Sequence, residues 1–361
     1  MKARDSKDVL ADGFVLSEAR PTLGDVGMLS LGVALRAYYS TYKSMEYMLH
    51  IFAKGKPRED WGRKHSTEYV IACTQTVIHM QHFAELFCKE ALRSLHKLHA
   101  DEVPSAVVFD KLLQGEALNL SELAGLRSTE FSAALARLCE LVKADRFPSG
   151  KYDFILTERD WLMNLNTLRN RVLHRGAFVL HYPALDELMG RFAFPFVKKA
   201  LDALDTKARK HLWRHPDLAC KIEPMAAIAD AYAAGNPDIG HIALLKELGR
   251  AAYQIPFSDL PLSKILEESL EQRYTRAAEI ESKDGNIAEL TTCPVCGKGT
   301  LLVFDDTQLE GEDYETGTYE RGWYYTWKVE CRCCSFEINH HLKNPSDYGL
   351  SIPDFWQSHE V

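Results

Sequence analysis

Several familiar features are missing from this sequence of 361 residues, and each absence excludes a class of protein. No apolar run approaches the roughly 18 to 20 residues that a membrane-spanning helix requires. The N-terminal segment MKARDSKDVLADGF lacks the apolar core of a secretory signal peptide. No glycine-rich phosphate loop, serine–histidine–aspartate order or cluster of metal-binding carboxylates stands out. We therefore expect a cytoplasmic protein without a membrane partner and without those kinds of active site.

Positive charge is also scarce, because 43 lysines and arginines face 51 acidic residues, for a net charge of −8. Affinity for phosphate backbones comes from lysine and arginine, so this balance argues against a general nucleic-acid coat protein. One segment departs from it: between Trp161 and Arg214, ten basic residues stand against four acidic ones. That segment is either a solvated helical face or a track for RNA, and the sequence leaves both interpretations open.

Two cysteine pairs near the end of the chain predict a metal site. Cys293-Pro-Val-Cys296-Gly is followed, 34 residues later, by Cys331-Arg-Cys333-Cys334. Two such knuckles can close a tetrahedral zinc site of four sulfurs, and the arrangement resembles a zinc ribbon. We predict a structural Zn²⁺ on Cys293, Cys296, Cys331 and Cys334, with no open position for catalysis. Cys333 lies next to Cys334 in the second knuckle and is an alternative ligand. We prefer Cys334 as the partner of Cys331.

Alternatives to this metal site stay open at the sequence level. His340 and His341 are backup ligands, and reactive or redox thiols are the other interpretation of the paired cysteines. The ribbon's partner, RNA or protein, is not determined. Its aromatic residues either stack on bases or form a small core, which we favour (Trp323, Tyr324, Tyr325 and Trp327). The remaining cysteines lie singly among apolar neighbours and are expected to be buried (Cys73, Cys88, Cys139 and Cys220).

The hydrophobic pattern predicts a mainly α-helical protein with a small C-terminal β element. We expect four parts: an irregular N-terminal arm (1–34), a helical domain (35–215), a helical connector without chemistry (216–288) and a zinc-ribbon domain (289–361). Predicted helices cover 35–53, 66–99, 104–113, 121–143, 157–176 and 185–212, with an interruption near Pro195. Ser121 and Ser128 are expected N-caps. Predicted strands cover 300–304 and 322–330.

The most informative segment is Arg169-Asn170-Arg171-Val172-Leu173-His174, late in the 157–176 helix. At about 100° per residue, Leu165, Leu168 and Val172 share one face and form the core stripe. Asn170 and His174 then point to the opposite side, which argues against a purely structural histidine. The arginine-to-histidine spacing alone is weak evidence for a catalytic site, because an arginine precedes a histidine at a similar distance five times in the chain.

The motif resembles the R-N-x3-H signature of HEPN ribonucleases, which carry it late in an up-and-down bundle of four to five helices. The segment Thr76–Leu95 resembles an early HEPN helix, with Glu85 and Lys89 on one face. The resemblance covers roughly residues 35 to 215. It implies an endoribonuclease whose catalytic residues are Arg169, Asn170 and His174. The neighbouring cations Arg171 and Arg175 are candidates for RNA contact.

The chemistry of these side chains suits metal-independent RNA cleavage. Histidine transfers protons near neutral pH, and arginine offers a permanently charged fork to phosphate oxygens. Arg169 and His174 stand about 140° apart on a straight helix, so one motif converges poorly on one phosphate. We therefore expect a homodimer whose cleft is built from two motif helices.

The resemblance also implies a toxin or antiviral effector, restrained by an antitoxin or another regulatory protein. Two other classes compete with the enzyme. One is a non-catalytic HEPN scaffold or adaptor with a partner-binding zinc-ribbon tail. The other is a zinc-dependent transcription protein with a coincidental motif, which the acidic net charge disfavours.

Overall fold

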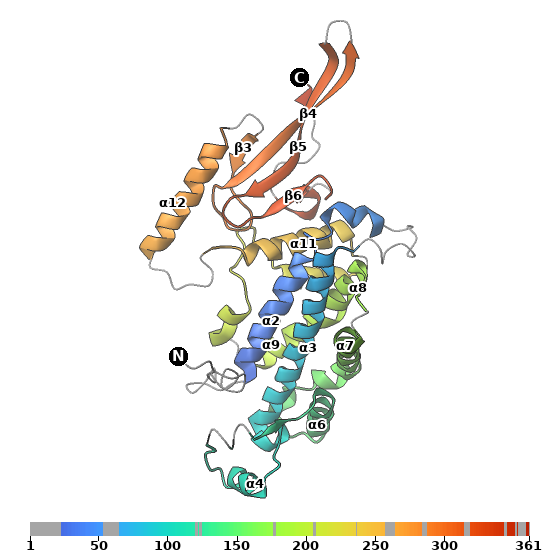
Figure 1. Cartoon of the computed structure of the whole chain (residues 1–361), viewed down its shortest axis with the longest axis vertical. Helices are drawn as coiled ribbons and strands as arrows, with labels where there is room; N and C mark the ends of the chain where they lie inside the picture. The colour runs from blue at the N-terminus through green and yellow to red at the C-terminus, as the bar shows by residue number, and fades with distance from the viewer. Residues whose placement is uncertain are drawn as a thin grey trace, which may run out of the picture. The chain divides into compact units, whose positions relative to one another are not determined.

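The structure is a computed structural model, mainly helical with a small antiparallel sheet near the C-terminus, as predicted (Figure 1). It describes residues 23–52, 65–119, 122, 125–175, 178–204, 207–235, 237–256, 264–283, 287–313, 318–342, 345–350, 352 and 359–360. At a few of these positions, including His174 and Arg175, the backbone is described and the side chain is not. The predicted cap Ser121 lies outside the described residues.

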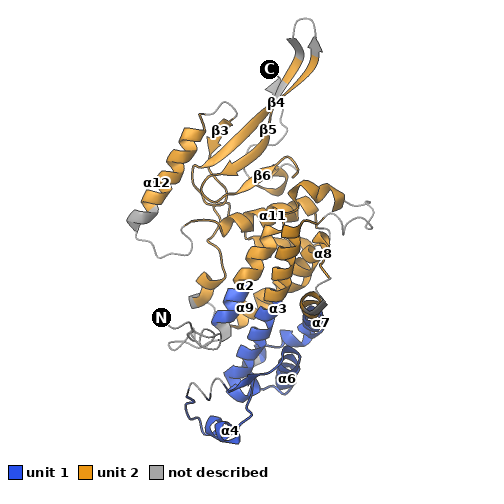
Figure 2. Cartoon of the chain, viewed as in Figure 1, with its two compact units in different colours: residues 1–31, 80–167 blue, residues 32–79, 168–361 orange. Residues whose placement is uncertain are grey.

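The chain divides into two compact units (Figure 2). Unit 1 comprises residues 1–31 and 80–167, and unit 2 comprises residues 32–79 and 168–361. The divisions fall inside three helices: α2 (Leu23–Ser40), α3 (Thr67–Leu95) and α7 (Phe154–Arg175). The four-part functional organisation proposed from the sequence stays a prediction.

Unit 1 is built on the second part of α3 and the first part of α7, with α4 (Ala106–Leu113) and α6 (Phe131–Lys143). Its core includes Phe83, Phe87 and Leu162, which are fully or almost fully buried. A short bridge pairs β1 (Asp101–Glu102) with β2 (Arg127–Ser128). Short 3-10 helices cover Lys97–His99 and Pro148–Gly150. The predicted shared face of Glu85 and Lys89 is confirmed, because their side chains form a 2.5 Å ion pair.

Unit 2 holds the remaining helices. They are α8 (Tyr182–Glu187), a π-helical turn (Leu188–Ala193), α9 (Phe194–Ala203), α10 (Pro224–Ala233), α11 (Ile239–Ala252) and α12 (Lys264–Glu281), with 3-10 helices at Glu46–Phe52, Lys207–Leu212 and Pro345–Tyr348. Every residue of α11 from Ile242 to Gly249 is buried. A Cβ on Gly249 would lie 2.7 Å from Tyr39 Cδ2, so glycine allows α11 to pack closely against that ring. Helix α11 is therefore a core element.

The sheet of unit 2 has the order β3 (Ile287–Thr291), β4 (Leu301–Asp313), β5 (Thr318–Cys331) and β6 (Glu337–Asn339), with β7 (His359–Glu360) also on β5. All of its pairings are antiparallel. Residues Leu301, Leu302 and Val303 are buried. An irregularity between Phe304 and Asp305 separates this buried end from the outer part of the hairpin.

Four sequence predictions were wrong. The helix expected at 35–53 ends at Ser40 and is followed by turns and the 3-10 helix Glu46–Phe52. The helix expected at 121–143 is not continuous, because β2 occupies Arg127–Ser128 and α6 begins only at Phe131. Residues 23–34 belong to α2 and not to an irregular arm, because Met28 and Leu31 bury a helical face in spite of the nearby glycines. Ser128 is no N-cap: it lies in β2, and α6 begins at Phe131 after Glu130, which makes no side-chain cap bond. The predicted helices at 66–99 and 157–176 are confirmed with shifts of a few residues at their ends. The two predicted strands are confirmed as parts of longer strands, since β4 continues to Asp313 and β5 begins at Thr318.

Candidate metal centre and motif helix

Four cysteine side chains converge at one end of the sheet of unit 2. The sulfurs of Cys293, Cys296, Cys331 and Cys334 all lie within 4.8 Å of one another. Two of the separations are 3.6 Å (Cys293 to Cys334) and 3.7 Å (Cys296 to Cys331). A tetrahedral zinc with Zn–S bonds of about 2.3 Å needs sulfurs ~3.8 Å apart. The four sulfurs therefore lie close enough together to bind a zinc-sized ion, and the predicted ligand set is the one that clusters.

The two knuckles repeat the same backbone turn. The N–H four residues after each first cysteine donates to that cysteine's carbonyl, from Gly297 to Cys293 (2.9 Å) and from Ser335 to Cys331 (3.0 Å). Gly297 has φ 71° and Ser335 has φ 55°, both in the left-handed region. Glycine adopts that region without steric cost, and serine does so only under constraint. The glycine after the first pair was a usable sequence signal, and the second knuckle lacks it.

Hydrogen bonds to sulfur complete each knuckle. The backbone N–H of Val295 donates to Cys293 Sγ and that of Cys333 to Cys331 Sγ, both at 3.4 Å. Thr300 Oγ1 lies 3.1 Å from Cys331 Sγ. Hydrogen bonding from the Cys293 thiol lowers the pKa of Cys331 to about 7. The same contacts raise the pKa of the Cys293 and Cys334 thiols, so the four sulfurs share protons unequally, whereas metal ligation requires each of them as a thiolate.

The residues competing for the role of ligand lie outside the cluster. Cys333 is buried, but it contributes no sulfur to the group of four. The rings of His340 and His341 contact each other in a tilted arrangement, with centroids 4.1 Å apart, and neither belongs to the group. The preference for Cys331 with Cys334 is thus confirmed.

Helix α11 holds the second knuckle through two charged side chains that the sequence did not single out. The Arg250 guanidinium donates to the backbone carbonyl of Ser335 and, at 3.2 Å, to its hydroxyl. Glu247, fully buried, binds Arg250 and accepts a 2.7 Å hydrogen bond from the backbone N–H of Glu337. The metal cluster is therefore joined to the helical core of unit 2.

Helix α12 neutralises the cations of the knuckles. Lys298, beside the first knuckle, forms a 2.5 Å ion pair with Glu271. Arg332, inside the second knuckle, donates to Glu281 at 2.7 Å and also pairs with Glu330. The basic side chains nearest the cysteine cluster are thus engaged by acids of the same chain.

A second missed feature is a buried ion pair within unit 2. Lys246 of α11 lies 2.7 Å from Asp186 of α8, and its ammonium lies 3.7 Å from the centroid of the Tyr182 ring. Burial lowers the pKa of Lys246 to about 8, against the attraction of Asp186. The two residues lie 60 positions apart, so no local pattern in the sequence indicates their pairing.

The motif helix brings two of the three predicted catalytic residues together. Arg169 Nη1 donates to Asn170 Oδ1 at 3.0 Å. Arg169 Nε is shielded from solvent and has no hydrogen-bond partner within the described part of the chain. Asn170 is exposed, and the Arg171 guanidinium lies 3.9 Å over the ring of Phe178. His174 and Arg175 end the helix, and their side chains lie outside the described residues.

The core stripe of this helix follows the expected phase. Leu162 and Leu165 are buried, and Leu168 and Val172 are half-buried. Leu173, inside the motif, is 43% exposed. The motif therefore occupies the part of the helix whose side chains are less buried and contribute less to the core.

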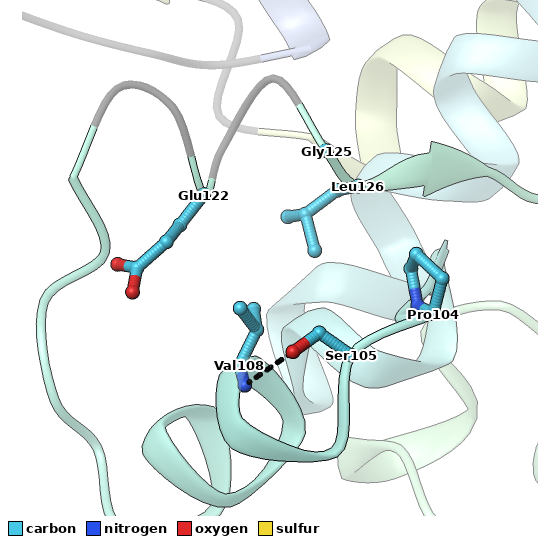
Figure 3. Close-up of a pocket in the computed structure, with 6 residues that line it drawn as sticks. All are labelled: Pro104, Ser105, Val108, Glu122, Gly125 and Leu126. Carbon is cyan, nitrogen blue, oxygen red and sulfur yellow. Dashed lines mark hydrogen bonds between the residues drawn. The ribbon is translucent and has the colours of Figure 1, made fainter.

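One surface cavity of about 260 Å³ lies in unit 1 beside α4 (Figure 3). Its lining is mostly apolar or backbone (Pro104, Ser105, Val108, Glu122, Gly125 and Leu126). The Ser105 hydroxyl caps α4 by accepting from the Val108 N–H, and the Glu122 carboxylate binds Lys111. Its polar groups are engaged locally, so the cavity offers no evident chemistry.

Comparisons with protein-family models, with curated proteins and with solved structures gave no match for this chain. Within the described ranges, no helix has both the length and the apolar character needed to cross a membrane.

Proposed function

We propose that this protein is a metal-independent RNA endonuclease of the HEPN type, acting as a toxin or antiviral effector. Arg169, Asn170 and His174 are its proposed catalytic residues, with Arg171 and Arg175 contacting RNA. The four-cysteine cluster is proposed to hold a structural zinc ion. With four thiolate ligands that ion has no open coordination position, so no catalytic metal is expected.

The observation that carries this proposal is the side-chain pair of Arg169 and Asn170. Asn170 orients one arm of the guanidinium, and the Arg169 Nε is left without a described partner. A shielded guanidinium nitrogen without a partner is costly in free energy. Because Nε is shielded, a phosphate would bind Arg169 through the terminal Nη atoms, which offer charge-assisted hydrogen bonds to phosphate oxygens.

The proposed reaction is an internal phosphoryl transfer. A base removes the proton of a ribose 2′-hydroxyl, and the 2′-oxygen forms a bond to the adjacent phosphorus. The bond from phosphorus to the 5′-oxygen breaks, and an acid protonates that oxygen. The products are a 2′,3′-cyclic phosphate and a 5′-hydroxyl. His174 is assigned proton transfer, and Arg169 stabilises the charge on phosphate oxygens.

The proposed enzyme works as a homodimer with a composite cleft. The angular separation of about 140° between Arg169 and His174 favours groups from two facing helices. The exposure of Leu173 supports the same arrangement, since an apolar side chain beside the motif gains by burial against a second copy.

A non-catalytic scaffold is the second candidate, and the exposed Leu173 fits it equally well. In that case the motif helix binds a partner protein, such as an antitoxin or regulator, and the arginines are contact residues. A measurement of RNA cleavage distinguishes the ribonuclease from the scaffold, because only the ribonuclease cleaves RNA.

The test is cleavage of single-stranded RNA by purified wild type, Arg169→Ala and Arg159→Ala in buffer containing a chelator. Arg159 is an exposed arginine on the same helix and is the matched control. The proposal expects Arg169→Ala alone to lose cleavage by at least about a hundredfold. Equal cleavage rates for all three proteins would show that Arg169 is not catalytic. No cleavage by any of them would favour the non-catalytic scaffold.

A further inference from the structure

The outer part of the β4–β5 hairpin is a two-stranded ribbon. Strand β3 pairs with β4 only up to Phe304, and β6 pairs with β5 only from Lys328 onward. Among the described residues between Asp305 and Thr326, the two strands pair with each other, and β7 adds a pairing at 323–324. We call residues 305–313 and 318–326 the acidic ribbon. An isolated two-stranded hairpin is marginally stable in water, so such an extension gains from a docking partner.

The ribbon carries charge of one sign. The acidic ribbon contains six acidic residues and one basic residue, Arg321. Asp306 and Glu310 are exposed, and so is Leu309 between them, at 46%. Lys298 and Arg332 at the cysteine cluster are already paired with acids of α12. This surface repels RNA and suits a basic polypeptide.

The chain itself contains a surface of complementary charge. Residues 191–204 and 207–214, which we call the basic segment, hold seven basic residues and one acidic residue, Asp202. Lys198, Lys199 and Lys210 are exposed. Helix α9 of this segment packs on the π-helical turn and α10, whereas β4 and β5 pack on β3, β6 and β7. The two surfaces thus belong to different packing neighbourhoods, and a second copy can bring them together.

We propose that the acidic ribbon of one copy docks on the basic segment of a second copy, and that the contact is reciprocal. A two-fold axis then makes the contact twice, as symmetric dimers require. The docked ribbon occupies the basic surface to which RNA would otherwise bind. It therefore limits RNA binding until RNA displaces it. That consequence rests on the proposed function, whereas the docking itself does not.

The test is a charge swap in the full-length protein. The ribbon variant is Asp306→Lys with Glu310→Lys, and the segment variant is Lys198→Glu with Lys199→Glu. The control is Glu268→Lys with Glu279→Lys, which reverses two exposed charges on α12. Self-association of each protein is measured by sedimentation velocity at low salt and near 1 M salt, where the Debye length is about 3 Å, so that the salt-dependent part separates this charged contact from the apolar motif-helix contact proposed above.

Each swapped variant alone should self-associate roughly tenfold more weakly than wild type at low salt, because like charges then face each other. An equimolar mixture should recover association, because each reversed surface meets its opposite. The control should behave as wild type, and high salt should remove the differences. Recovery in the mixture also shows that both variants are folded.

The docking proposal is overturned if either swapped variant self-associates as wild type does, or if the mixture fails to recover. In that case the ribbon has another partner. The RNA cleavage assay above is independent of this measurement. A protein that self-associates as described and does not cleave RNA would refute the proposed function and leave the docking in place.

Discussion

Lys246 Nζ lies 2.7 Å from Asp186 Oδ1 in the interior of unit 2, and both side chains are fully or almost fully buried. The pair joins α11 to α8 across 60 residues of sequence. Two opposite charges taken out of water stabilise each other only while both are present, because a single buried charge is costly. This contact fixes the position of α11, and α11 in turn holds the second knuckle.

Replacing Lys246 by Met should lower the free energy of unfolding by roughly 3–5 kcal/mol, because Asp186 then remains buried without a cation. The double variant Lys246→Met with Asp186→Leu should recover most of that loss. Urea unfolding followed by circular dichroism measures both, with Lys143→Met on the surface of α6 as the control. A single variant as stable as wild type would show that the pair is not needed.

The contrast between α11 and the cysteine cluster shows what sequence can predict here. Cysteine pairs have a local spacing dictated by tetrahedral coordination, so their four ligands could be predicted without a structure. Lys246 and Asp186 have no such local signature, because their partnership exists only after distant helices pack. The start of α2 was missed for a related reason: Gly24 and Gly27 indicate turns locally, and the packing of Met28 and Leu31 outweighs them.

Metal content distinguishes the fifth cysteine from the ligands. Purified wild type and Cys333→Ser should each carry one equivalent of zinc, because Cys333 lies outside the four-sulfur group. Cys334→Ser should lose metal and unfold the second knuckle, since folding and metal binding are coupled in such sites. Elemental analysis of the two variants provides the comparison. Retention by Cys334→Ser and loss by Cys333→Ser would reverse the assignment.

The backbone turn after the first cysteine pair requires glycine. Gly297→Ala places a side chain at φ 71° and within 3.2 Å of the Ala219 Cβ. We expect a cost of about 1–2 kcal/mol, hence roughly tenfold weaker zinc binding in competition with a chelator. Gly299→Ala is the control, because a Cβ there meets no heavy atom within 4 Å. Equal zinc affinity in both variants would argue against this account of the turn.

Arg250 is predicted to couple the metal cluster to the helical core. Arg250→Ala leaves the buried Glu247 without its cation and removes two hydrogen bonds to Ser335. The loss of stability should be about 3 kcal/mol, and zinc should leave faster in the presence of a chelator. Arg276→Ala, an exposed arginine on α12, serves as the comparison. Unchanged zinc release from Arg250→Ala would show that the helical core does not stabilise the metal cluster.

The central claim is that His174 transfers a proton in RNA cleavage, and one assay tests it most directly. Wild type, His174→Ala and His181→Ala are incubated with RNA in chelator-containing buffer, and the fragment ends are mapped. We expect wild type and His181→Ala to leave 2′,3′-cyclic phosphate and 5′-hydroxyl ends, and His174→Ala to be slower by about 10² to 10⁴. Cleavage by His174→Ala at the wild-type rate would contradict the claim.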